Sequence, residues 1–322
     1  MHLLTKTTET ELNRVQTTIA KELTSEKIIQ EIYDYIFNVK GKKTRALLCL
    51  LASKSSDIKP SSRIALASII ELLHTATLVH DDVVDESERR RGSKSVNQVW
   101  TNSYSVLMGD FIYSKAFILM VKLGVSSILD ELAKATNDIA RGEIIQLELF
   151  ENKQPITLDD LLKVSYLKTG RLFEASAKTG AMLACKSKEE IKIFGLLGKT
   201  LGTAFQIKDD ILDYEAFRID TGKPLFQDFR EGKITFPLYF ALQNANKKNR
   251  RFLLDRLGQS KLLKKDQNVI YQLIQDDKTQ KEINALLDKY AKETLKHLNK
   301  LKHHPCYNEM LKLINFSHLR KI

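Results

Sequence analysis

The stretch from Ile64 to Asp85 reads IALASIIELLHTATLVHDDVVD, and it decides the fold class of this chain. It is apolar on nearly every face of a helix, which is typical of a buried helix rather than a surface one. A second stretch, from Ile191 to Asp213, reads IKIFGLLGKTLGTAFQIKDDILD and has the same character. Two such stretches predict an all-α protein in which long helices pack around a cavity.

The rest of the chain shows further helix signals and no strong strand signal. The segments Ser187–Glu190 and Thr157–Asp160 have the pattern of a capping box, which opens a helix. The Asn-Gly and Asp-Gly pairs that mark tight hairpins are absent from the sequence. We find no repeat, low-complexity tract or linker, so we expect one domain over residues 1–322.

The charge is strongly basic, with a formal net value of +11. Nucleic acid, an anionic membrane surface or a polyanionic small substrate would each account for it. Much of the excess lies in Lys247–Lys248 and Lys261–Lys265, which we expect to form a solvated helix face. A nucleic-acid partner is not favoured, because the basic C-terminal region has no clear pattern of interleaved aromatic residues.

The cysteines and the apolar runs predict a cytoplasmic location. The three cysteines, Cys49, Cys185 and Cys306, are far apart and have no metal-ligand spacing, as reduced thiols would be. Residues 1–14 are polar and do not resemble a signal peptide. No run approaches the roughly 20 apolar residues that span a bilayer, so we expect no transmembrane segment.

Two aspartate clusters carry the functional prediction. The motif Asp81-Asp82-Val-Val-Asp85 ends the first buried stretch, and Asp209-Asp210-Ile-Leu-Asp213 ends the second with the same spacing. Residues i and i+4 share a helix face, so the outer aspartates of each motif repel one another unless a cation lies between them. Carboxylate oxygens are ligands that suit Mg²⁺. We therefore expect the two aspartate clusters to bind Mg²⁺.

The surroundings of the motifs indicate the chemistry. Carboxylates hold the metal, the metal neutralises a diphosphate, and that diphosphate then leaves more easily. The apolar helix behind each motif offers a dry pocket for a hydrocarbon tail. The pairs Asp159–Asp160 and Asp276–Asp277 lack a third aspartate and lie in polar stretches, so we interpret them as surface residues.

With these motifs in place, the chain resembles the trans-isoprenyl diphosphate synthases, most closely the long-chain, octaprenyl-type members. Residues His74–Asp85 followed by Arg89–Gly92 resemble the first aspartate-rich motif of the family, and Phe205–Asp213 resembles the second. Further blocks follow in the family's order: Gly109–Asp110, Lys168–Thr169, Thr221–Pro224 and Glu231–Lys233.

The resemblance implies roles for individual residues. The diphosphate of isopentenyl diphosphate would be held by Lys42, Arg45, His74 and Arg91. The allylic diphosphate would be held or flanked by Arg90, Lys168, Thr169, Gln206 and Lys223. The Mg²⁺ ligands would be Asp81, Asp82, Asp85, Asp209, Asp210 and Asp213, with Asp81, Asp85 and Asp209 foremost. Lys208 and Lys233 would add positive charge.

Several of these residues also have a purely structural interpretation. His74 could be a core histidine, Gln206 a buried amide bonded to a neighbouring helix, and Thr169 a residue that bonds back within its own helix. We interpret Gly109 and Asp110 as packing and orientation residues. One block departs from the family's Gly-Gly-Lys-Arg-x-Arg-Pro pattern: residues 40–46 read KGKKTRA, which keeps Lys42 and Arg45.

The resemblance implies a prenyltransferase that ionises an allylic diphosphate. We expect the departing diphosphate oxygen to take up the proton, because no side-chain base is evident in the motifs. The resemblance also implies farnesyl diphosphate as the primer, an octaprenyl-like product for quinone side chains, a homodimer, and at most transient membrane contact during product release. The family blocks the product tunnel of short-chain enzymes with an aromatic residue at the position of Ala76. Ala76 and its neighbour Thr77 are not bulky, so a long product is expected.

Two other functions remain open at this point. The first is a terpene cyclase of related fold, which usually replaces the second aspartate motif with an Asn/Ser/Glu pattern. The second is a non-catalytic subunit of a heteromeric synthase, which would be expected to lack or degrade the motifs. Both motifs are intact here.

Overall fold

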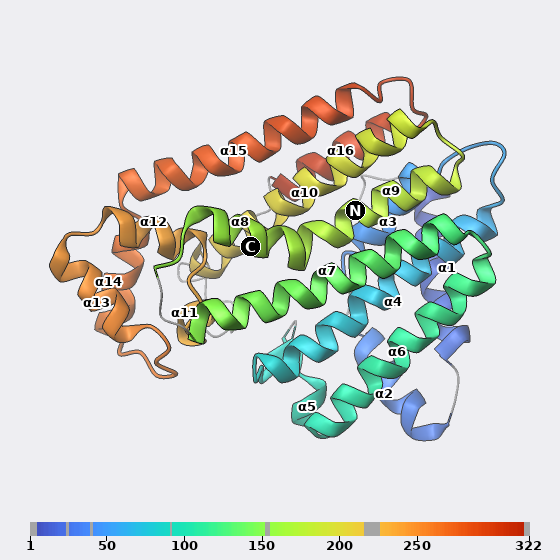
Figure 1. The fold of residues 1–322 in the computed structure, drawn as a ribbon. Helices are drawn as coiled ribbons and strands as arrows, with labels where there is room; N and C mark the ends of the chain where they lie inside the picture. The colour runs from blue at the N-terminus through green and yellow to red at the C-terminus, as the bar shows by residue number, and fades with distance from the viewer. Residues whose placement is uncertain are drawn as a thin grey trace. The chain divides into compact units, whose positions relative to one another are not determined.

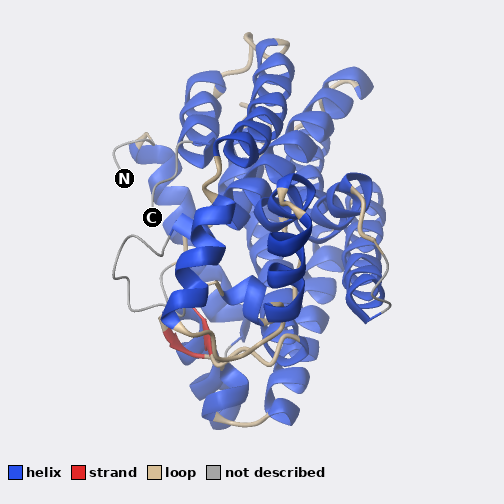
Figure 2. Ribbon diagram, turned by 90° about the vertical axis from the view of Figure 1, so that its left-hand side faces the viewer, coloured by secondary structure: helices blue, strands red, loops and turns tan. Residues whose placement is uncertain are grey.

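The computed structural model describes residues 5–23, 26–38, 41–90, 92–151, 155–215 and 226–318. Nearly all of them are helical, and within these ranges the strands are limited to one pair of two residues each (Figure 2). The predicted all-α fold is confirmed, and the two buried stretches form the long helices α4 (Pro60–Val84) and α10 (Lys188–Glu215).

The chain divides into two compact units. Unit 1 consists of Met1–Thr136, Leu172–Gly198 and His297–Leu313, and unit 2 consists of Asn137–Arg171, Lys199–Lys296 and Ile314–Ile322. The helices α7 (Ser126–Glu151) and α10 each contribute residues to both units. The expectation of one domain over residues 1–322 stays a prediction.

Unit 1 is built around α4. Its core joins α4 to α1, α3 and α6, which pack against it (Figure 1). The elements of this unit outside α4 and the shared helices are α1 (Lys6–Leu23), α2 (Lys27–Asn38), α3 (Thr44–Ala52), β1 (Arg89–Arg90), β2 (Ser93–Lys94), α5 (Val96–Val99), α6 (Asn102–Leu123) and α9 (Arg171–Leu183, whose first residue lies in unit 2).

Unit 2 contains the remaining helices around two apolar clusters. A π-helix, Tyr166–Gly170, follows α8 directly and leads into α9. The other elements are α8 (Leu158–Ser165), α11 (Gln227–Arg230), α12 (Phe236–Asn244), α13 (Lys247–Arg256), α14 (Lys264–Ile274) and most of α15 (Asp277–Asn299), while α16 (Tyr307–His318) begins in unit 1 and ends here.

Both predicted capping boxes are confirmed. The Thr157 hydroxyl accepts a hydrogen bond from the Asp160 backbone N–H at 3.2 Å, and the Asp160 carboxylate accepts one from the Thr157 N–H at 3.0 Å. Ser187 and Glu190 make the same reciprocal pair at the start of α10, at 3.2 and 3.3 Å. These bonds satisfy backbone N–H groups that the first turn of a helix leaves without partners.

The helix α4 forms the interior of unit 1. By length and composition alone, it is the one helix among the described residues that could cross a bilayer. However, 72% of its apolar window is buried inside the protein. It begins with Pro60 in its first turn, where a missing N–H costs nothing. The apolar character of α4 is therefore that of a core helix.

The hairpin β1–β2 is a feature that the sequence analysis did not find. Its strands pair antiparallel, with Arg89 opposite Lys94 and Arg90 opposite Ser93. Gly92 in the turn has φ of 86°, a conformation that glycine adopts without steric cost. The strands are only two residues long and the turn is not Asn-Gly or Asp-Gly, so no periodic signal marked them.

Candidate active site

The first aspartate motif occupies the C-terminal end of α4. Asp82 is buried, and its Oδ1 accepts a hydrogen bond from Arg90 Nε at 2.7 Å. Asp81 and Asp85 are half-buried. Asp85 also ends the helix, because its N–H donates to the Asp81 carbonyl at 2.8 Å. The middle aspartate is thus committed to the hairpin, while the outer two share the exposed side of the helix end.

His74 and Arg45, two predicted diphosphate ligands, are brought together as expected. Arg45 Nη1 lies 3.0 Å from His74 Nε2. A guanidinium can only donate, so His74 Nε2 must be the acceptor and carries no proton in this contact. The Arg45 guanidinium also lies 4.6 Å from the centre of the Phe173 ring. Arg45 is therefore held in a fixed orientation at the start of α3.

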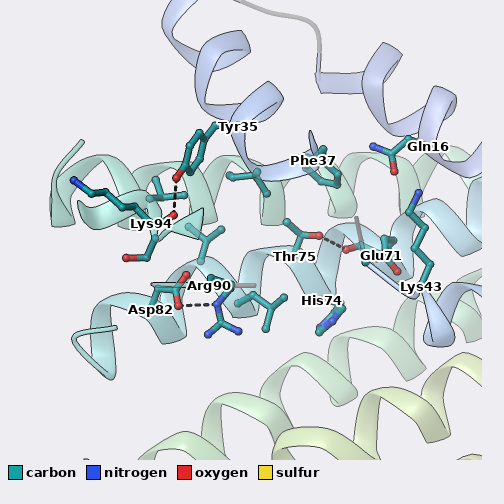
Figure 3. Close-up of a pocket in the computed structure, with 16 residues that line it drawn as sticks. Gln16, Tyr35, Phe37, Lys43, Glu71, His74, Thr75, Asp82, Arg90 and Lys94 are labelled. Atoms are coloured by element: carbon teal, nitrogen blue, oxygen red, sulfur yellow. Dashed lines mark hydrogen bonds and ion pairs between the residues drawn. The ribbon is translucent and has the colours of Figure 1, made fainter. Parts of the chain in front are cut away.

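A pocket of about 400 Å³ lies beside these residues in unit 1 (Figure 3). One wall is the face of α4 from Glu71 to Asp82, and the opposite wall comes from α1, α2 and the hairpin. Its lining combines apolar surface with charged and polar groups. The lining residues are Gln16, Tyr35, Ile36, Phe37, Gly41, Lys43, Glu71, His74, Thr75, Leu78, Val79, Asp82, Arg90, Lys94, Ser95 and Val96.

The structure places Lys43, rather than Lys42, at this pocket. Lys42 is exposed and does not line it, whereas Lys43 is half-buried and does. Lys43 has φ of 47°, a left-handed conformation that is rare for lysine and carries a cost of about 1–2 kcal/mol. Burial lowers the pKa of the Lys43 ammonium, while the nearby Glu71 carboxylate acts in the opposite direction. No sequence pattern had indicated a role for Lys43, and the role predicted for Lys42 stays a prediction.

Other lining residues were also not predicted. Tyr35 OH donates a hydrogen bond to the Lys94 carbonyl at 2.7 Å, which ties α2 to β2 (Figure 3). Thr75 Oγ1 donates to the Glu71 carbonyl at 2.8 Å within α4. No motif marks Tyr35. Glu71 and Thr75 lie within three residues of His74 on α4, and this proximity could have indicated that they line the same pocket.

The second aspartate motif, in unit 2, repeats the arrangement of the first. Its middle residue, Asp210, is buried, and its Oδ1 accepts a hydrogen bond from Gln206 Nε2 at 2.7 Å. Asp210 Oδ2 accepts one from the Phe236 N–H at 3.4 Å. Asp213 is half-buried and accepts backbone bonds from Gln227 and Asp228 at 3.2 and 3.3 Å.

Burial and the neighbouring Asp228 carboxylate make it costly to ionise the aspartates of this second motif. Burial, followed by the Asp228 carboxylate, raises the pKa of Asp213 to about 8. Burial and Asp228 also raise the pKa of Asp210 well above its usual value, with a smaller contribution from Asp209. The site therefore favours a bound proton, or any other positive charge that can take its place.

Thr169 and Gln206 form one hydrogen-bonded unit with this motif. Thr169 Oγ1 donates to Gln206 Oε1 at 2.6 Å, so the hydroxyl does not bond back within its own helix. Gln206 passes the connection on to Asp210 through its amide. The predicted pair Thr169 and Gln206 is thus brought together, and its geometry fixes the orientation of the amide.

Lys168 is positioned from α7. Its ammonium makes an ion pair with Glu143 at 2.5 Å and a hydrogen bond to Gln146 Oε1. Gly142 permits this close approach, because a Cβ there would lie 2.7 Å from Leu167 Cβ and 3.2 Å from the Lys168 backbone nitrogen. Lys168 and Thr169 both belong to the π-helix, a feature that recurs at functional sites. Glu143 and Gln146 had no motif to mark them.

The block Gly109–Asp110 has the packing role that we predicted. A Cβ at Gly109 would lie 2.2 Å from His80 Nε2, so a larger residue there would displace the His80 ring. His80 Nε2 lies 3.1 Å from the Val106 carbonyl and 3.3 Å from Asp110 Oδ1. These contacts hold the last turn of α4, directly before Asp81.

The remaining predicted residues fall into two groups. Arg91 and Lys223, with the block Thr221–Pro224, lie outside the described residues. Lys208 and Lys233 are described, and each has an ion-pair partner, Glu215 at 3.6 Å and Glu231 at 2.8 Å.

The predicted tunnel residues line up with the core of unit 1. Ala76 is fully buried in one cluster with Leu72, Leu73, Met120 and Leu132. A long product tunnel needs a floor deeper than Ala76, and these four residues are our candidates for it. Ile139, a fifth candidate, belongs to unit 2. Thr77 is half-buried, and its hydroxyl donates to the His74 carbonyl at 2.7 Å.

The donor set fits a hard divalent cation. All six aspartates offer only oxygen, and the raised pKa values of Asp210 and Asp213 show negative charge that a cation would relieve. In the described part of the chain, no three His, Cys, Asp or Glu side chains already converge as a ready ligand cage. Such sites for Mg²⁺ use one or two carboxylates together with substrate phosphates.

Comparison with known proteins agrees with this geometry. The family model for polyprenyl synthetase matches residues 26–275. The octaprenyl diphosphate synthase of Escherichia coli is 41% identical over 232 residues, 72% of each chain. A short chain isoprenyl diphosphate synthase of Methanothermobacter thermautotrophicus is 30% identical over 325 residues, covering 100% of this chain and 94% of that one.

A solved structure extends the similarity to three dimensions. A polyprenyl synthase of Caulobacter crescentus, complexed with calcium and isoprenyl diphosphate, matches with a TM-score of 0.89 at 31% identity. The match covers 98% of this chain and 96% of that one. Aspartate motifs at two helix ends, an apolar core behind them and these matches lead to one conclusion. The chain belongs to the polyprenyl synthetase family, the prenyltransferases of isoprenoid biosynthesis.

Proposed function

We propose that this chain is a Mg²⁺-dependent trans-polyprenyl diphosphate synthase that extends farnesyl diphosphate with isopentenyl diphosphate to an octaprenyl-like product for quinone side chains. The observation that carries the proposal is the repeated arrangement of the two motifs. In both, the middle aspartate is buried and bonded to a polar side chain, Arg90 or Gln206. The outer aspartates of each motif lie four positions apart on the same helix face, where a shared cation would offset their repulsion.

Mg²⁺ would be held by the outer aspartates, Asp81 and Asp85 in the first motif and Asp209 and Asp213 in the second. When bound, it would neutralise the diphosphate and make that group a better leaving group. Asp82 and Asp210, predicted as ligands too, would instead position Arg90 and Gln206. Calcium in the C. crescentus structure supports a divalent cation in this role.

The allylic substrate would be bound by cationic groups and stabilised by a fixed dipole. Arg90 and Lys168 would hold its diphosphate. By resemblance, Lys223 would also hold the allylic diphosphate, and Arg91 would hold the diphosphate of isopentenyl diphosphate. Ionisation of the carbon–oxygen bond leaves an allylic carbocation, which preorganised dipoles stabilise in a water-poor site. The amide oxygen of Gln206 and the hydroxyl of Thr169, fixed 2.6 Å apart, would supply such dipoles.

Isopentenyl diphosphate would bind at the pocket of unit 1. Arg45 and His74 would hold its diphosphate, and Lys43 is better placed than Lys42 to join them. The double bond of isopentenyl diphosphate attacks the carbocation, a carbon–carbon bond forms, and a proton leaves to an oxygen of the departed diphosphate. The product is again allylic, so the cycle can repeat.

The long product is supported by the core around Ala76. The position five residues before the first motif is Ala76, which is not bulky, so the tail could pass along α4 toward Leu73 and Met120. Relatives differ in their products, since one is an octaprenyl synthase and another a short-chain synthase. The octaprenyl length and the farnesyl primer therefore belong to the proposal.

A homodimer is supported by the outer side of α6. Several of its large apolar side chains are exposed, including Leu107 at 66%, Ile118 at 48% and Val121 at 67%. These residues recur at helical spacing, so they share one side of the helix. We propose that a second copy covers this side, in a cytoplasmic enzyme.

A terpene cyclase and a non-catalytic subunit are the alternatives, and the intact second motif speaks against both. The deciding experiment incubates the purified chain with farnesyl diphosphate, labelled isopentenyl diphosphate and Mg²⁺, followed by mass analysis. We expect a linear all-trans series that ends near octaprenyl diphosphate, and no product in the Asp209→Ala variant. A cyclic hydrocarbon, or no turnover by the chain alone, would refute the proposal.

A further inference from the structure

The outer surface of α13, α14 and the loop between them combines positive charge with exposed apolar side chains. Between residues 247 and 269 the chain has eight Lys and Arg against two Asp. Three large apolar side chains are exposed there, Leu254 at 45%, Leu263 at 63% and Val269 at 37%. We had expected these lysines to form a solvated helix face. A purely solvated face would not be expected to expose several large apolar side chains beside its lysines, as this one does.

Ion pairs account for only part of the charge. Asp255 pairs with Arg251 at 3.6 Å, and Asp266 pairs with Arg256 at 2.9 Å. Five lysines make no ion pair with any described residue and are exposed: Lys247, Lys248, Lys261, Lys264 and Lys265. We call these five lysines, together with Leu254, Leu263 and Val269, the basic–apolar patch.

Helical spacing places the two kinds of residue side by side. Leu254 lies seven positions after Lys247, and Val269 lies four positions after Lys265. Each of these two apolar side chains therefore shares a helix face with a lysine. Leu253, Leu262 and Ile270 are buried in one core cluster. The two helices and their loop (Figure 1) thus cover the same core and turn the basic–apolar patch toward solvent.

We propose that the basic–apolar patch docks on the surface of an anionic lipid bilayer. Lysines attract anionic head groups, while leucine and valine side chains enter the boundary between head groups and acyl chains. A nucleic acid would be attracted by the lysines, but the exposed leucine side chains would add nothing to its binding. A second protein copy suits α6 better, because the exposed apolar residues of that helix are not surrounded by a comparable excess of lysine.

Docking on a bilayer would help the enzyme to release its product, a role that rests on the proposed function. A long polyprenyl diphosphate has an apolar tail and an anionic head, so it must pass from the enzyme into a bilayer. A synthase that rests on the membrane would release this product where it dissolves. The docking itself needs neither substrate nor metal and can be measured separately.

The first test is flotation of the full chain with vesicles of phosphatidylcholine, with and without phosphatidylglycerol. We expect binding only to the anionic vesicles. Lys264→Glu/Lys265→Glu should weaken it about tenfold or more, since each lysine near such a surface contributes about 1 kcal/mol. These positions open α14, where acidic residues suit the helix dipole, so folding is preserved.

The matched control is Lys300→Glu/Lys302→Glu, which makes the same charge change at exposed positions of unit 1. It should keep wild-type binding within about twofold, because it leaves every residue of the basic–apolar patch unchanged. If both double variants lost vesicle binding equally, binding would depend on the net charge of the protein and not on the basic–apolar patch, and the proposal would be overturned.

The apolar contribution is tested by Leu254→Ser/Leu263→Ser. This variant should lose vesicle binding about tenfold, as expected for two partly inserted leucines, and its binding to duplex DNA in a gel shift should be unchanged. Tighter binding to DNA than to vesicles, with no effect of the leucine variant on either, would assign the surface to nucleic acid instead.

Condensation activity in detergent should be the same in all variants. If the wild type floated with vesicles but made no product, the proposed function would fail and the docking surface would stand.

Discussion

Arg90 Nε lies 2.7 Å from Asp82 Oδ1, and this contact joins the hairpin β1–β2 to the end of α4. The Asp82 side chain is only 3% exposed, whereas that of Arg90 is 34% exposed. The buried carboxylate therefore orients the guanidinium, which remains open to a substrate on its other side. Within the first motif, Asp82 is thus the residue that positions Arg90.

We predict opposite effects for two neighbouring substitutions. Asp82→Asn should lower the free energy of unfolding by about 1 kcal/mol, because a charge-assisted hydrogen bond becomes a neutral one. Asp81→Asn should leave stability unchanged or raise it, because it removes one of two like charges at a helix C-terminus. It should nevertheless abolish most of kcat. Urea unfolding and steady-state rates measure both quantities, and identical stability losses in the two variants would contradict the assignment.

The crowded second motif predicts a pH-dependent response to Mg²⁺. Folding raises the pKa of Asp213 to about 8, against about 4 in the unfolded chain. The folded protein thus binds more protons between these values, and its metal-free stability falls as pH rises from 4 to 8. Mg²⁺ replaces that proton, so it should raise Tm more at pH 8 than at pH 6.

Thermal unfolding with and without Mg²⁺ at both pH values checks this. Asp213→Asn should flatten the difference, while Asp288→Asn, at an exposed position of α15, should leave it unchanged. A Mg²⁺ effect that is independent of pH in the wild type would count against metal binding at Asp213.

The pocket of unit 1 predicts a difference between two adjacent lysines. Lys43→Asn should raise KM for isopentenyl diphosphate about tenfold or more, because it removes a charge-assisted contact of about 1.5–3 kcal/mol. Asparagine tolerates the left-handed backbone at this position, so strain does not increase. Lys42→Asn, at the exposed position, should change KM less than threefold. Steady-state kinetics with isopentenyl diphosphate varied would decide it, and the reverse order of effects would restore Lys42 as the ligand.

Product length should respond to Ala76. Ala76→Phe should shorten the products sharply while the first condensation survives, because the ring would fill the path beside α4. Ala67→Phe is the matched control. It overpacks the same core, but it lies nine residues earlier and so on the opposite face of the helix. Mass analysis of products should show a normal length for Ala67→Phe, and unchanged products from both folded variants would remove Ala76 from the tunnel wall.

The sequence predicted what depends on local spacing. The long helices α4 and α10 follow from apolar stretches, and both capping boxes follow from side chains that bond within four residues. The pairing of Arg45 with His74 and of Thr169 with Gln206 followed from the resemblance, since these residues lie 29 and 37 positions apart. No periodicity could have brought them together.

What the sequence did not predict depends on backbone conformation or on distant contacts. The left-handed backbone at Lys43 decides which of two identical side chains enters the pocket. The partners of Lys168, Glu143 and Gln146, are set by how closely α7 approaches at Gly142. The hairpin was missed because its two short strands are stabilised by Asp82 rather than by their own composition.

The π-helix at Tyr166–Gly170 makes the spacing of this segment unusually sensitive to insertions and deletions. A π turn holds one more residue than an α turn of the same span, so Lys168 and Thr169 point where they do only while that extra residue is present. Deleting one residue here would allow an uninterrupted α-helix, which is the more stable local structure. It would also remove the bulge that sets the directions of the Lys168 and Thr169 side chains. Relatives that share Lys168 should therefore tolerate length changes in their loops but keep this stretch at constant length.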